Sequence, residues 1–584
     1  MKILGMHASG PNTSACLLID GKLISFAEEE RFNRIKLASN NIPTNATKFC
    51  LNKAKLNLSE VDYITIGWDN TKYPEKMKGF YSKRMSHPKK DEFSFAFENI
   101  SLAEKSPNVF KKKLQISLKR AGFNDELPKL VFHEHHLSHA YSVFFPSPFK
   151  KSLILVIDGS GEEYSSSVWL GENNKVSLLE KYTLPDSLGY FYAAITEFLG
   201  FSAYTGEGKV MGLAPYGKPN RNIRKKLHEF LWFEKDTYKI NPEFVYFDDR
   251  SYSLKHTDKL NKLLNKFPRL PETKIDDWHC DLAWECQSIL EKTIEFILKK
   301  HVIKNNINNV CIAGGVAMNC KMNGFIQNLP FIDDCFVIPT SNDAGVSYGS
   351  ALIQENNSKI LERKFNYFNP YLGPNYTNSE IKNALEKLKI KKFKKLNNKN
   401  LIQHVTSKLV SGEIIGWFQG SMEMGPRALG NRSILANPSI KGMKDKINKQ
   451  VKFREAFRPF APIILDERFD DLVNTKSKIG NRYIHNYMLL AGKATNTLIK
   501  IAPDIVHVDN TVRPQIVIKK NNEPLYNLLN KFYLESGIPV LLNTSFNIRG
   551  EPIVCNPIDA IKCFFSTGLD TLILENYVIE KTSF

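Results

Sequence analysis

Short apolar runs alternate with amphipathic stretches along the first part of the chain. Residues 1–21 predict a strand, a Gly-Pro-Asn turn and a second strand that ends at Asp20-Gly21. Residues 151–170, KSLILVIDGSGEEYSSSVWL, predict a β-hairpin with a Gly-rich turn, and residues 278–302 predict a long amphipathic helix. This alternation favours an α/β fold, in which ligand-facing turns lie at the C-terminal ends of strands.

Two further stretches repeat the order strand, polar turn and helix: residues 308–326 and residues 334–352. The composition changes at residues 366–380, where Asn, Pro, Gly and Tyr crowd together before a Lys-rich helical pattern. We therefore expect one domain over residues 1–360, a linker over 361–380 and a second domain over 381–584. The second region also mixes helices and strands.

The composition describes an ordinary soluble globular protein, with 584 residues, 42% hydrophobic and 24% charged. No apolar run is long enough to span a bilayer, so we expect no membrane partner. The nine cysteines are scattered without a CxxC pair. This pattern indicates a reducing cytosol and argues against a disulfide framework and a structural zinc site.

The net charge of +19 suggests a polyanionic partner or sites for phosphate-bearing ligands. Residues 351–500 hold most of it, with 27 Lys and Arg against 12 Asp and Glu. The richest run, residues 385–400, is LEKLKIKKFKKLNNKN. Two alternatives compete with nucleic-acid binding: a solvated helix face in a Lys- and Asn-rich proteome, and a small-anion site. Residues 73–90 also interleave Tyr and Phe with Lys and Arg, which suits phosphate contact and base stacking.

Four of the 13 histidines lie in one stretch, HEHHLSHA, at residues 133–140. His135 and His139 are spaced i, i+4, which on a helix places both rings on one face. Asp158 ends an apolar strand, and Asp343 stands in a similar place. Together they could form a site with two nitrogen and two oxygen ligands, which suits iron, manganese or zinc better than magnesium. The alternative is that the histidines face water and each Asp forms a turn.

A Gly-Gly turn between a predicted strand and helix could bind a nucleotide phosphate. Gly314 and Gly315 would offer backbone N–H groups at the helix N-terminus, with Asn319 beside them. The signal is weak by itself. The stretch TGEGKVMGLAPYG lacks the P-loop spacing, which excludes a Walker-type NTPase, and no GxSxG or kinase signature is present.

The second region gathers arginines and lysines among Gly, Pro and aromatic residues. Such arginines often form forks for phosphate or carboxylate, although structural salt bridges are the alternative. Several clusters beside one Asn-Thr-Ser loop suggest a site for a small polyanion. The candidates are Arg427, Arg432, Lys452, Arg454, Arg458, Arg513, Asn543, Thr544, Ser545 and Arg549.

Nine stretches between residues 14 and 554 carry a family resemblance. In chain order they are SACLLIDGKLISFAEEERFNRIK, HHLSHA, VIDGSGE, GEGKVMGLAPYG, AGGVAMNC, NDAGVSYGSAL, MGPRALGNRSILANP, KFREAFRPFAP and NTSFNIRGEPIV. The chain resembles the O-carbamoyltransferase family of nodulation and antibiotic-tailoring enzymes over nearly its whole length.

The resemblance implies an N-terminal domain of the actin-like superfamily, similar to threonylcarbamoyl-transferase proteins. It implies a C-terminal α+β domain similar to threonylcarbamoyl-AMP synthases. The second domain would join ATP, bound with Mg²⁺, and carbamoyl phosphate into carbamoyl adenylate. The first would transfer the carbamoyl group to an acceptor hydroxyl.

The resemblance also implies roles for residues. His135, His139, Asp158 and Asp343 would hold a metal, usually iron as Fe(II), which would act as a Lewis acid. Arg427, Lys452, Arg458 and Ser545 would hold carbamoyl phosphate, and Arg432, Arg513 and Arg549 are weaker candidates for the ATP phosphates. Lys36 matches a lysine near the transfer site, where His139 would also act. Several members carry a catalytic His just before the Ser-Ala of the first hairpin. This chain has Pro11-Asn12 there, which leaves His7 or another group as the base.

The acceptor is open. A small molecule or sugar is favoured over a 5-hydroxymethylpyrimidine in DNA, which would require base flipping. Two other classes compete: an actin-like sugar kinase and a non-catalytic nucleotide-binding protein. Homodimerisation is also left open.

Overall fold

The structure is a computed structural model that describes residues 1–8, 10–69, 71, 106–247, 254–359, 361, 363, 368–476 and 482–581. The chain divides into two compact units. The N-unit comprises Met1–Ser25 and Ser39–Asn366, and the C-unit comprises Phe26–Ala38 and Tyr367–Phe584. Residues 26–38 thus belong to the C-unit although they lie near the start of the chain, which the sequence pattern did not indicate. The predicted linker, residues 361–380, lies partly outside the described residues.

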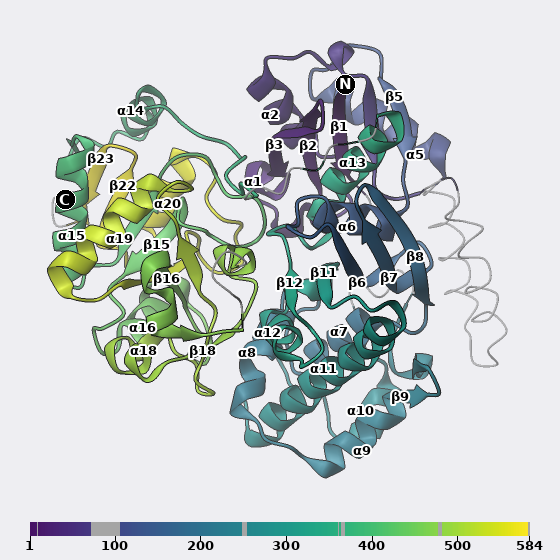
Figure 1. Cartoon of the computed structure of the whole chain (residues 1–584). Coiled ribbons are helices and arrows are strands. Elements are labelled where there is room, and N and C mark those ends of the chain that lie inside the picture. Colours follow the sequence, from purple (N-terminus) through teal and green to yellow (C-terminus); the bar gives the residue numbers. More distant parts are fainter. Residues whose placement is uncertain are drawn as a thin grey trace. The chain divides into compact units, whose positions relative to one another are not determined.

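The first sheet of the N-unit grows from the predicted N-terminal hairpin (Figure 1). Its strand order in the described chain is β3-β2-β1-β4-β5. β1 pairs antiparallel with β2 and parallel with β4, which in turn pairs parallel with β5. The bounds are β1 (Lys2–His7), β2 (Ser14–Ile19), β3 (Lys22–Glu28), β4 (Tyr63–Ile66) and β5 (Lys129–Phe132).

The second sheet repeats this arrangement within the described residues, in the order β8-β7-β6-β11-β12. Again a strand in the middle pairs antiparallel with the next strand in sequence and parallel with a later one. The doubled strand order agrees with the actin-like fold expected from the sequence and confirms the α/β class. The bounds are β6 (Lys151–Gly161), β7 (Tyr164–Glu172), β8 (Lys175–Thr183), β11 (Asn309–Ala313) and β12 (Asp334–Phe336).

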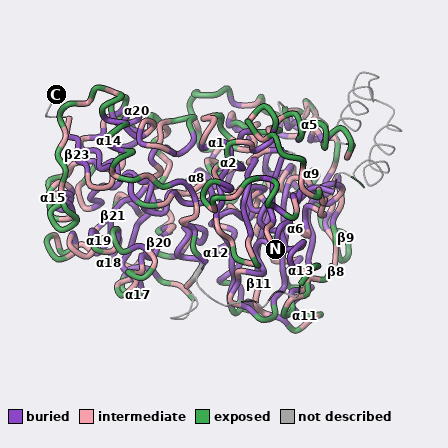
Figure 2. The backbone as a smooth tube through the Cα atoms, turned by 90° about the horizontal axis from the view of Figure 1, so that it is seen from above, coloured by how far each residue is buried: buried purple, intermediate pink, exposed green. Residues whose placement is uncertain are grey.

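Two helices lie between these sheets. α13 (Val346–Ser358) packs on the first sheet at β1, β2 and β4, and α6 (His135–Phe144) packs on the second sheet at β6 and β11. The two helices also pack against each other. The predicted long helix is α11 (Asp277–Asn305), which packs against α12 (Cys320–Asn328). Buried residues follow the strands and inner helices, and exposed residues follow outer helices such as α9 (Arg221–Phe230) (Figure 2).

The C-unit is built on a mixed sheet with the order β13-β23-β22-β14-β15-β21-β16-β20. Alternation along the strands gives it two apolar faces: Trp417 and Leu435 lie on one, and Phe418 and Ile434 on the other. This separate α+β unit agrees with the predicted C-terminal domain. The bounds are β13 (Lys394–Lys395), β14 (Ile415–Phe418), β15 (Arg432–Ala436), β16 (Ala461–Leu465), β20 (Gln515–Val517), β21 (Val540–Ser545), β22 (Thr571–Leu574) and β23 (Tyr577–Glu580).

Helices cover both faces of this sheet. α15 (Asn398–Val410) and α19 (Glu523–Ser536) cover the face of Trp417, and α14 (Asn378–Lys387) and α20 (Pro557–Phe565) contribute to the opposite face. The Lys-rich run 385–400 is therefore not one helix face, because it spans the end of α14, the edge strand β13 and the start of α15. In the part of the chain that is described, no helix combines the length and apolar character needed to cross a membrane.

Candidate metal centre and anion site

The histidine pair is presented by the first turn of α6. The helix begins at His135, and the Glu162 carboxylate accepts hydrogen bonds from the backbone N–H of His135, at 3.1 Å, and of Asp69, at 2.6 Å. Glu162 is buried and occupies the N-terminal end of the helix, where a negative charge is favourable. No local pattern indicates this role, because Glu162 lies in a hairpin turn 27 residues further along the chain than His135.

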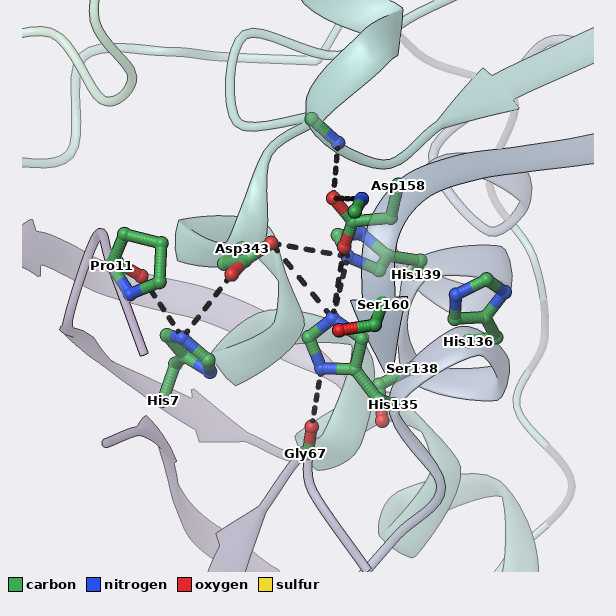
Figure 3. Close-up of polar contacts among 12 residues, drawn as sticks. His7, Pro11, Gly67, His135, His136, Ser138, His139, Asp158, Ser160 and Asp343 are labelled. Carbon is green, nitrogen blue, oxygen red and sulfur yellow. Dashed lines mark hydrogen bonds and ion pairs between the residues drawn. The ribbon is translucent and has the colours of Figure 1, made fainter. Parts of the chain in front are cut away.

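Four side chains converge in the N-unit (Figure 3). One ligand atom each from His135, His139, Asp158 and Asp343 lies within 4.8 Å of all the others, and all four residues are buried. His135 Nε2 lies 3.2 Å from both His139 Nε2 and Asp158 Oδ2. Asp343 Oδ1 lies 3.6 Å from His139 Nε2 and 3.8 Å from His135 Nε2. Ligands bound about 2.0–2.2 Å from one ion are separated by about 3–3.5 Å, so the spacing of His135, His139 and Asp158 suits one ion and Asp343 lies slightly further out. Two imidazoles and two carboxylates are a donor set that suits a transition metal.

Other contacts fix which atoms face the centre of this cluster. His135 Nδ1 donates to the Gly67 carbonyl at 3.0 Å, which leaves Nε2 as the acceptor nitrogen. Asp158 Oδ1 accepts from Gly159 N at 2.8 Å and Gly315 N at 3.2 Å, so Oδ2 faces the histidines. These contacts orient ligand atoms in the way that partners of metal ligands do.

The electrostatics of the cluster favour a cation. Burial, together with the Asp158 carboxylate, raises the pKa of Asp343. Burial would lower the pKa of His135, but Asp158 and Asp343 outweigh it and raise that pKa to about 9. Two buried carboxylates that face each other need a positive charge between them, which a proton or a metal ion can supply.

Two further histidines lie beside the cluster (Figure 3). His7 Nε2 lies 3.7 Å from Asp343 Oδ2 and donates to the Pro11 carbonyl at 3.1 Å. Burial lowers the pKa of His7 to about 3, so its ring is neutral at pH 7. His136 turns away and hydrogen-bonds with Ser167 Oγ at 2.8 Å, which gives it a structural role.

The candidate phosphate-binding turn already has internal partners. Gly314 N donates to the Ser341 carbonyl at 2.8 Å, and Gly315 N donates to Asp158. Asn319 exchanges hydrogen bonds with Gln287 and caps α12 through Met322 N. In this conformation the turn orients Asp158, and phosphate binding by these N–H groups would require them to leave their partners.

A second cluster forms in the C-unit around Lys452. This lysine ends a π-helical turn, η8 (Asn448–Lys452), a rare geometry that is frequent at functional sites. Its buried ammonium donates to the Ser545 carbonyl at 2.9 Å and to Asn547 O and Oδ1 at 2.8 and 2.7 Å. Burial holds the pKa of Lys452 well below its ordinary value, and Arg454, Arg458 and Lys36 add to the lowering. The structure thus brings Lys452 and Ser545 together.

The surrounding cations repel one another. Burial lowers the pKa of Arg458, Glu455 opposes it, and Arg549 and Arg513 lower it further. Burial holds the pKa of Arg454 well below its ordinary value, and Arg458 and Arg513 lower that pKa further. Such crowding of positive charge would favour a polyanion. We call this group the cation cluster; its members are Lys36, Arg427, Lys452, Arg454, Arg458, Arg513 and Arg549.

Arg432 has a different environment from the cation cluster, although it is close to Arg427 in sequence. Its guanidinium is fully buried and donates to the carbonyl groups of Gln419, Gly420, Asn431 and Pro374. It also lies 3.6 Å over the ring of Phe418. These contacts give Arg432 a structural role in place of the predicted contact with ATP phosphates.

Lys36 belongs to the cation cluster because residues 26–38 pack in the C-unit. The surrounding protein partly desolvates the exposed Lys36 side chain and lowers its pKa, Glu30 opposes this, and Arg31, Arg427 and Arg458 lower the pKa further. The sequence resemblance placed Lys36 near the transfer site. The structure groups it with the predicted carbamoyl phosphate cations.

Comparisons with known proteins agree with this two-unit picture. The family described as Carbamoyltransferase N-terminus matches residues 2–352, and Carbamoyltransferase C-terminus matches residues 406–581. An uncharacterized protein of Synechocystis sp. is 34% identical over 100% of this chain and 97% of its own length. Nodulation protein NolNO of Sinorhizobium fredii is 32% identical over 98% of this chain and 80% of its own.

Among solved structures, the activator of the 2-hydroxyisocaproyl-CoA dehydratase from Clostridium difficile is 14% identical, with a TM-score of 0.32. The match covers 62% of this chain and 96% of that one. The two family matches cover both units, and the relatives align over nearly the whole chain. The chain belongs to the carbamoyltransferase family and is a carbamoyl-transferring enzyme.

Proposed function

We propose that the protein is an ATP-dependent O-carbamoyltransferase that works in two steps, one in each unit. The C-unit makes carbamoyl adenylate from carbamoyl phosphate and ATP, and the N-unit transfers the carbamoyl group to a hydroxyl. The observation that carries this proposal is the separation of two kinds of site. The cation cluster around Lys452 lies in one unit, and the His135–Asp343 cluster lies in the other.

In the first step the cation cluster neutralises two anions. Lys452, Arg427 and Arg458, with Ser545 beside them, hold carbamoyl phosphate. Arg454, Arg513 and Arg549 face the ATP phosphates, which arrive with Mg²⁺. Water replaces the phosphate of carbamoyl phosphate, and a carbamate oxygen then bonds to the α-phosphorus of ATP as pyrophosphate leaves. Charge neutralisation lets the two anions approach without repulsion.

In the second step the acceptor hydroxyl bonds to the carbamoyl carbon, AMP leaves and the hydroxyl proton passes to a base. His135, His139, Asp158 and Asp343 would hold a divalent transition metal such as Fe(II), which supplies Lewis-acid polarisation of the carbonyl. His7 is the candidate base, since it lies beside Asp343 with a neutral ring. Its Nε2 donates to Pro11, so Nδ1 is the atom able to accept a proton.

The acceptor we favour is the hydroxyl of a small molecule or sugar. Part of the excess positive charge belongs to structural features that need no nucleic acid. These features are the cation cluster and the two lysines of the edge strand β13. Lysines on a sheet edge discourage pairing with other strands. The aromatic and basic segment 73–90, which favoured nucleic acid, lies outside the described residues. Hydroxymethylated DNA is therefore tested as the alternative acceptor.

The test separates the two half-reactions. Lys452→Ala should abolish ATP–pyrophosphate exchange that depends on carbamoyl phosphate, because a charge-assisted contact to a dianion is lost. His139→Ala should retain exchange and lose carbamoyl transfer to a panel of hydroxyl acceptors, read by mass spectrometry. Arg468→Ala serves as a control, because Arg468 bonds Asp471 and Tyr533 on the C-unit outside the cation cluster.

Two results would reject the scheme. Loss of the same half-reaction in both variants would show that the steps are not divided. Exchange that proceeds without carbamoyl phosphate would point to a different donor. Carbamoyl mass added only to hydroxymethylcytosine DNA would replace the small-molecule acceptor.

A further inference from the structure

Two charged residues from the start of the chain hydrogen-bond to both backbone polar groups of one residue of the C-unit. The Glu28 carboxylate accepts a hydrogen bond from Gly425 N at 2.8 Å. Arg31 Nη2 donates to the carbonyl of the same residue, Gly425, also at 2.8 Å. Both polar groups of this residue are therefore held from one side. We call Glu28 and Arg31 the Gly425 clamp.

Both clamp residues are buried. Burying charged side chains costs free energy, which a simple attachment of this segment would not require. Glu28 and Arg31 are 5% and 2% exposed, and Glu30 beside them is 6% exposed. Arg31 lies 2.9 Å from the Glu30 carboxylate and 3.5 Å from that of Glu28. Apolar residues of similar volume often give equal or greater stability than a buried ion pair. The use of three charged side chains here points to a geometric role.

The backbone segments around the clamp carry two members of the cation cluster, Arg427 and Lys36. Gly425 has φ of +89°, which favours glycine, and lies two residues before Arg427. On the other side, Glu30 accepts a hydrogen bond from Leu37 N at 2.6 Å, directly after Lys36. Lys36 and Arg427 interact electrostatically in the cluster. The clamp thus fixes the backbone next to Arg427, and Glu30, which is paired with Arg31 of the clamp, fixes the backbone next to Lys36.

We propose that Glu28 and Arg31 are positioning residues of the carbamoyl phosphate site. They hold the backbone of Gly425, and Arg31 also pairs with Glu30 beside Lys36, so that Arg427 and Lys36 present their charges to the same anion. The anion site of the C-unit is therefore complete only with residues 26–38, which follow the N-terminal hairpin in the chain. This inference rests on the proposed function, in which the cation cluster binds carbamoyl phosphate.

Arg34 supplies the comparison with a simple attachment. Its guanidinium donates to the carbonyls of Ile553 and Pro552, both at 2.7 Å, and lies 3.6 Å from Asp559. These contacts fasten the same segment to the C-unit without touching Gly425. If residues 26–38 only fasten the chain, loss of Arg34 and loss of the clamp should have similar effects.

The experiment compares three variants of the full chain. Glu28→Leu with Arg31→Met replaces the clamp by apolar side chains, Glu28→Gln keeps an acceptor for Gly425 N–H, and Arg34→Met breaks the other attachment. Each is measured for melting temperature and for KM of carbamoyl phosphate and of ATP in the pyrophosphate exchange assay. We expect the double variant to raise KM for carbamoyl phosphate about tenfold or more, with KM for ATP within about twofold, as loss of one charge-assisted contact implies. Glu28→Gln and Arg34→Met should stay near the wild-type KM values.

A double-mutant cycle that combines the clamp variant Glu28→Leu/Arg31→Met with Arg427→Lys tests whether the clamp acts through Arg427. If it does, the double variant should cause a smaller rise in KM in the Arg427→Lys background than in the wild type. Equal rises in both backgrounds, or an unchanged KM for carbamoyl phosphate in the double variant, would overturn the inference. An equal rise in the Arg34→Met variant would show a simple attachment.

Binding of inorganic phosphate by titration calorimetry separates this inference from the proposed function. If the wild type shows no exchange yet binds phosphate, the proposed reaction fails, and the clamp is still judged by whether the double variant weakens phosphate binding. Unchanged phosphate binding in that variant would again overturn the positioning role.

Discussion

At the scale of single residues, the geometry of the histidine cluster depends on a missing side chain. A Cβ placed on Gly161 would lie 2.3 Å from His135 Cδ2 and 2.8 Å from His136 Cδ2. Both rings are buried, and neither can move without disturbing its hydrogen bonds. Because Gly161 has no side chain, the end of strand β6 can pass close to His135 without displacing its ring.

We predict that Gly161→Ala lowers the metal content of the purified protein and destabilises the N-unit by about 1–3 kcal/mol, the usual range for overpacking. Elemental analysis and thermal unfolding measure the two effects. Gly208→Ala is the matched control, because a Cβ at Gly208 meets nothing within 4 Å. Full metal occupancy in Gly161→Ala would contradict the proposed ligand role of His135.

Also at the residue scale, Arg427 and Arg432 are close in sequence but have different environments and different expected roles. Both stand in the motif GPRALGNRS. Arg432 is fully buried and donates through Nη1 and Nη2 to carbonyl groups, whereas Arg427 interacts electrostatically with Lys36. We predict that Arg427→Ala weakens carbamoyl phosphate binding with little change in stability. Arg432→Ala should instead lower stability by about 3 kcal/mol or more, because a buried hydrogen-bond network is broken. Thermal unfolding beside the exchange assay distinguishes them, and equal loss of stability in both would refute the distinction.

At the scale of elements, an ion pair joins the edge strand β8 to the long helix α11. Glu180 accepts from His301 Nε2 and Lys300 Nζ, each at 2.6 Å. Burial alone would raise the pKa of Glu180, but these two partners outweigh it and lower the pKa to about 2. The carboxylate therefore favours the folded state above its unfolded pKa of 4.5.

This contribution should be lost as pH falls from about 4.5 towards 2. We predict that Glu180→Gln is less stable than the wild type by about 1–2 kcal/mol at pH 6, a value reduced for partial exposure. The gap should shrink as pH falls below about 4.5 and should close only at about pH 2 and below. Urea unfolding at several pH values measures it. Glu172→Gln removes an exposed pair with Lys151 on the same sheet and should show no comparable gap. A gap for Glu180→Gln that is as large at pH 2.5 as at pH 6 would contradict the assignment.

At the scale of the whole molecule, each unit has its own buried apolar residues and its own candidate ligand. A ligand that binds only one folded unit stabilises that unit by mass action, about 2.7 kcal/mol at one hundred times its Kd. We predict that inorganic pyrophosphate raises the thermal transition of the C-unit and that Lys452→Ala removes this shift. Differential scanning calorimetry with and without pyrophosphate tests it, and Arg468→Ala should keep the shift. A shift that survives in Lys452→Ala would place the anion elsewhere.

Local patterns in the sequence determined much of the molecule. The N-terminal hairpin, the hairpin at β6 and β7 and the helix α11 occur where the hydrophobic pattern predicts them. These elements are readable because strand and helix periods are set by neighbouring residues along the chain. The family resemblance, together with the i, i+4 spacing, also selected His135, His139, Asp158 and Asp343, which do lie together.

Only the tertiary structure decided the environments of the charged side chains. It places Glu162 at the start of α6, buries Arg432 among carbonyl groups, and adds Arg454 to the cation cluster. It also assigns residues 26–38 to the C-unit and uses Glu28 and Arg31 to hold Gly425, nearly 400 residues further along. The physical reason is that the pKa and the role of a charged side chain depend on its burial and on the groups it contacts. Both are set by segments far apart in the sequence, which no local pattern records.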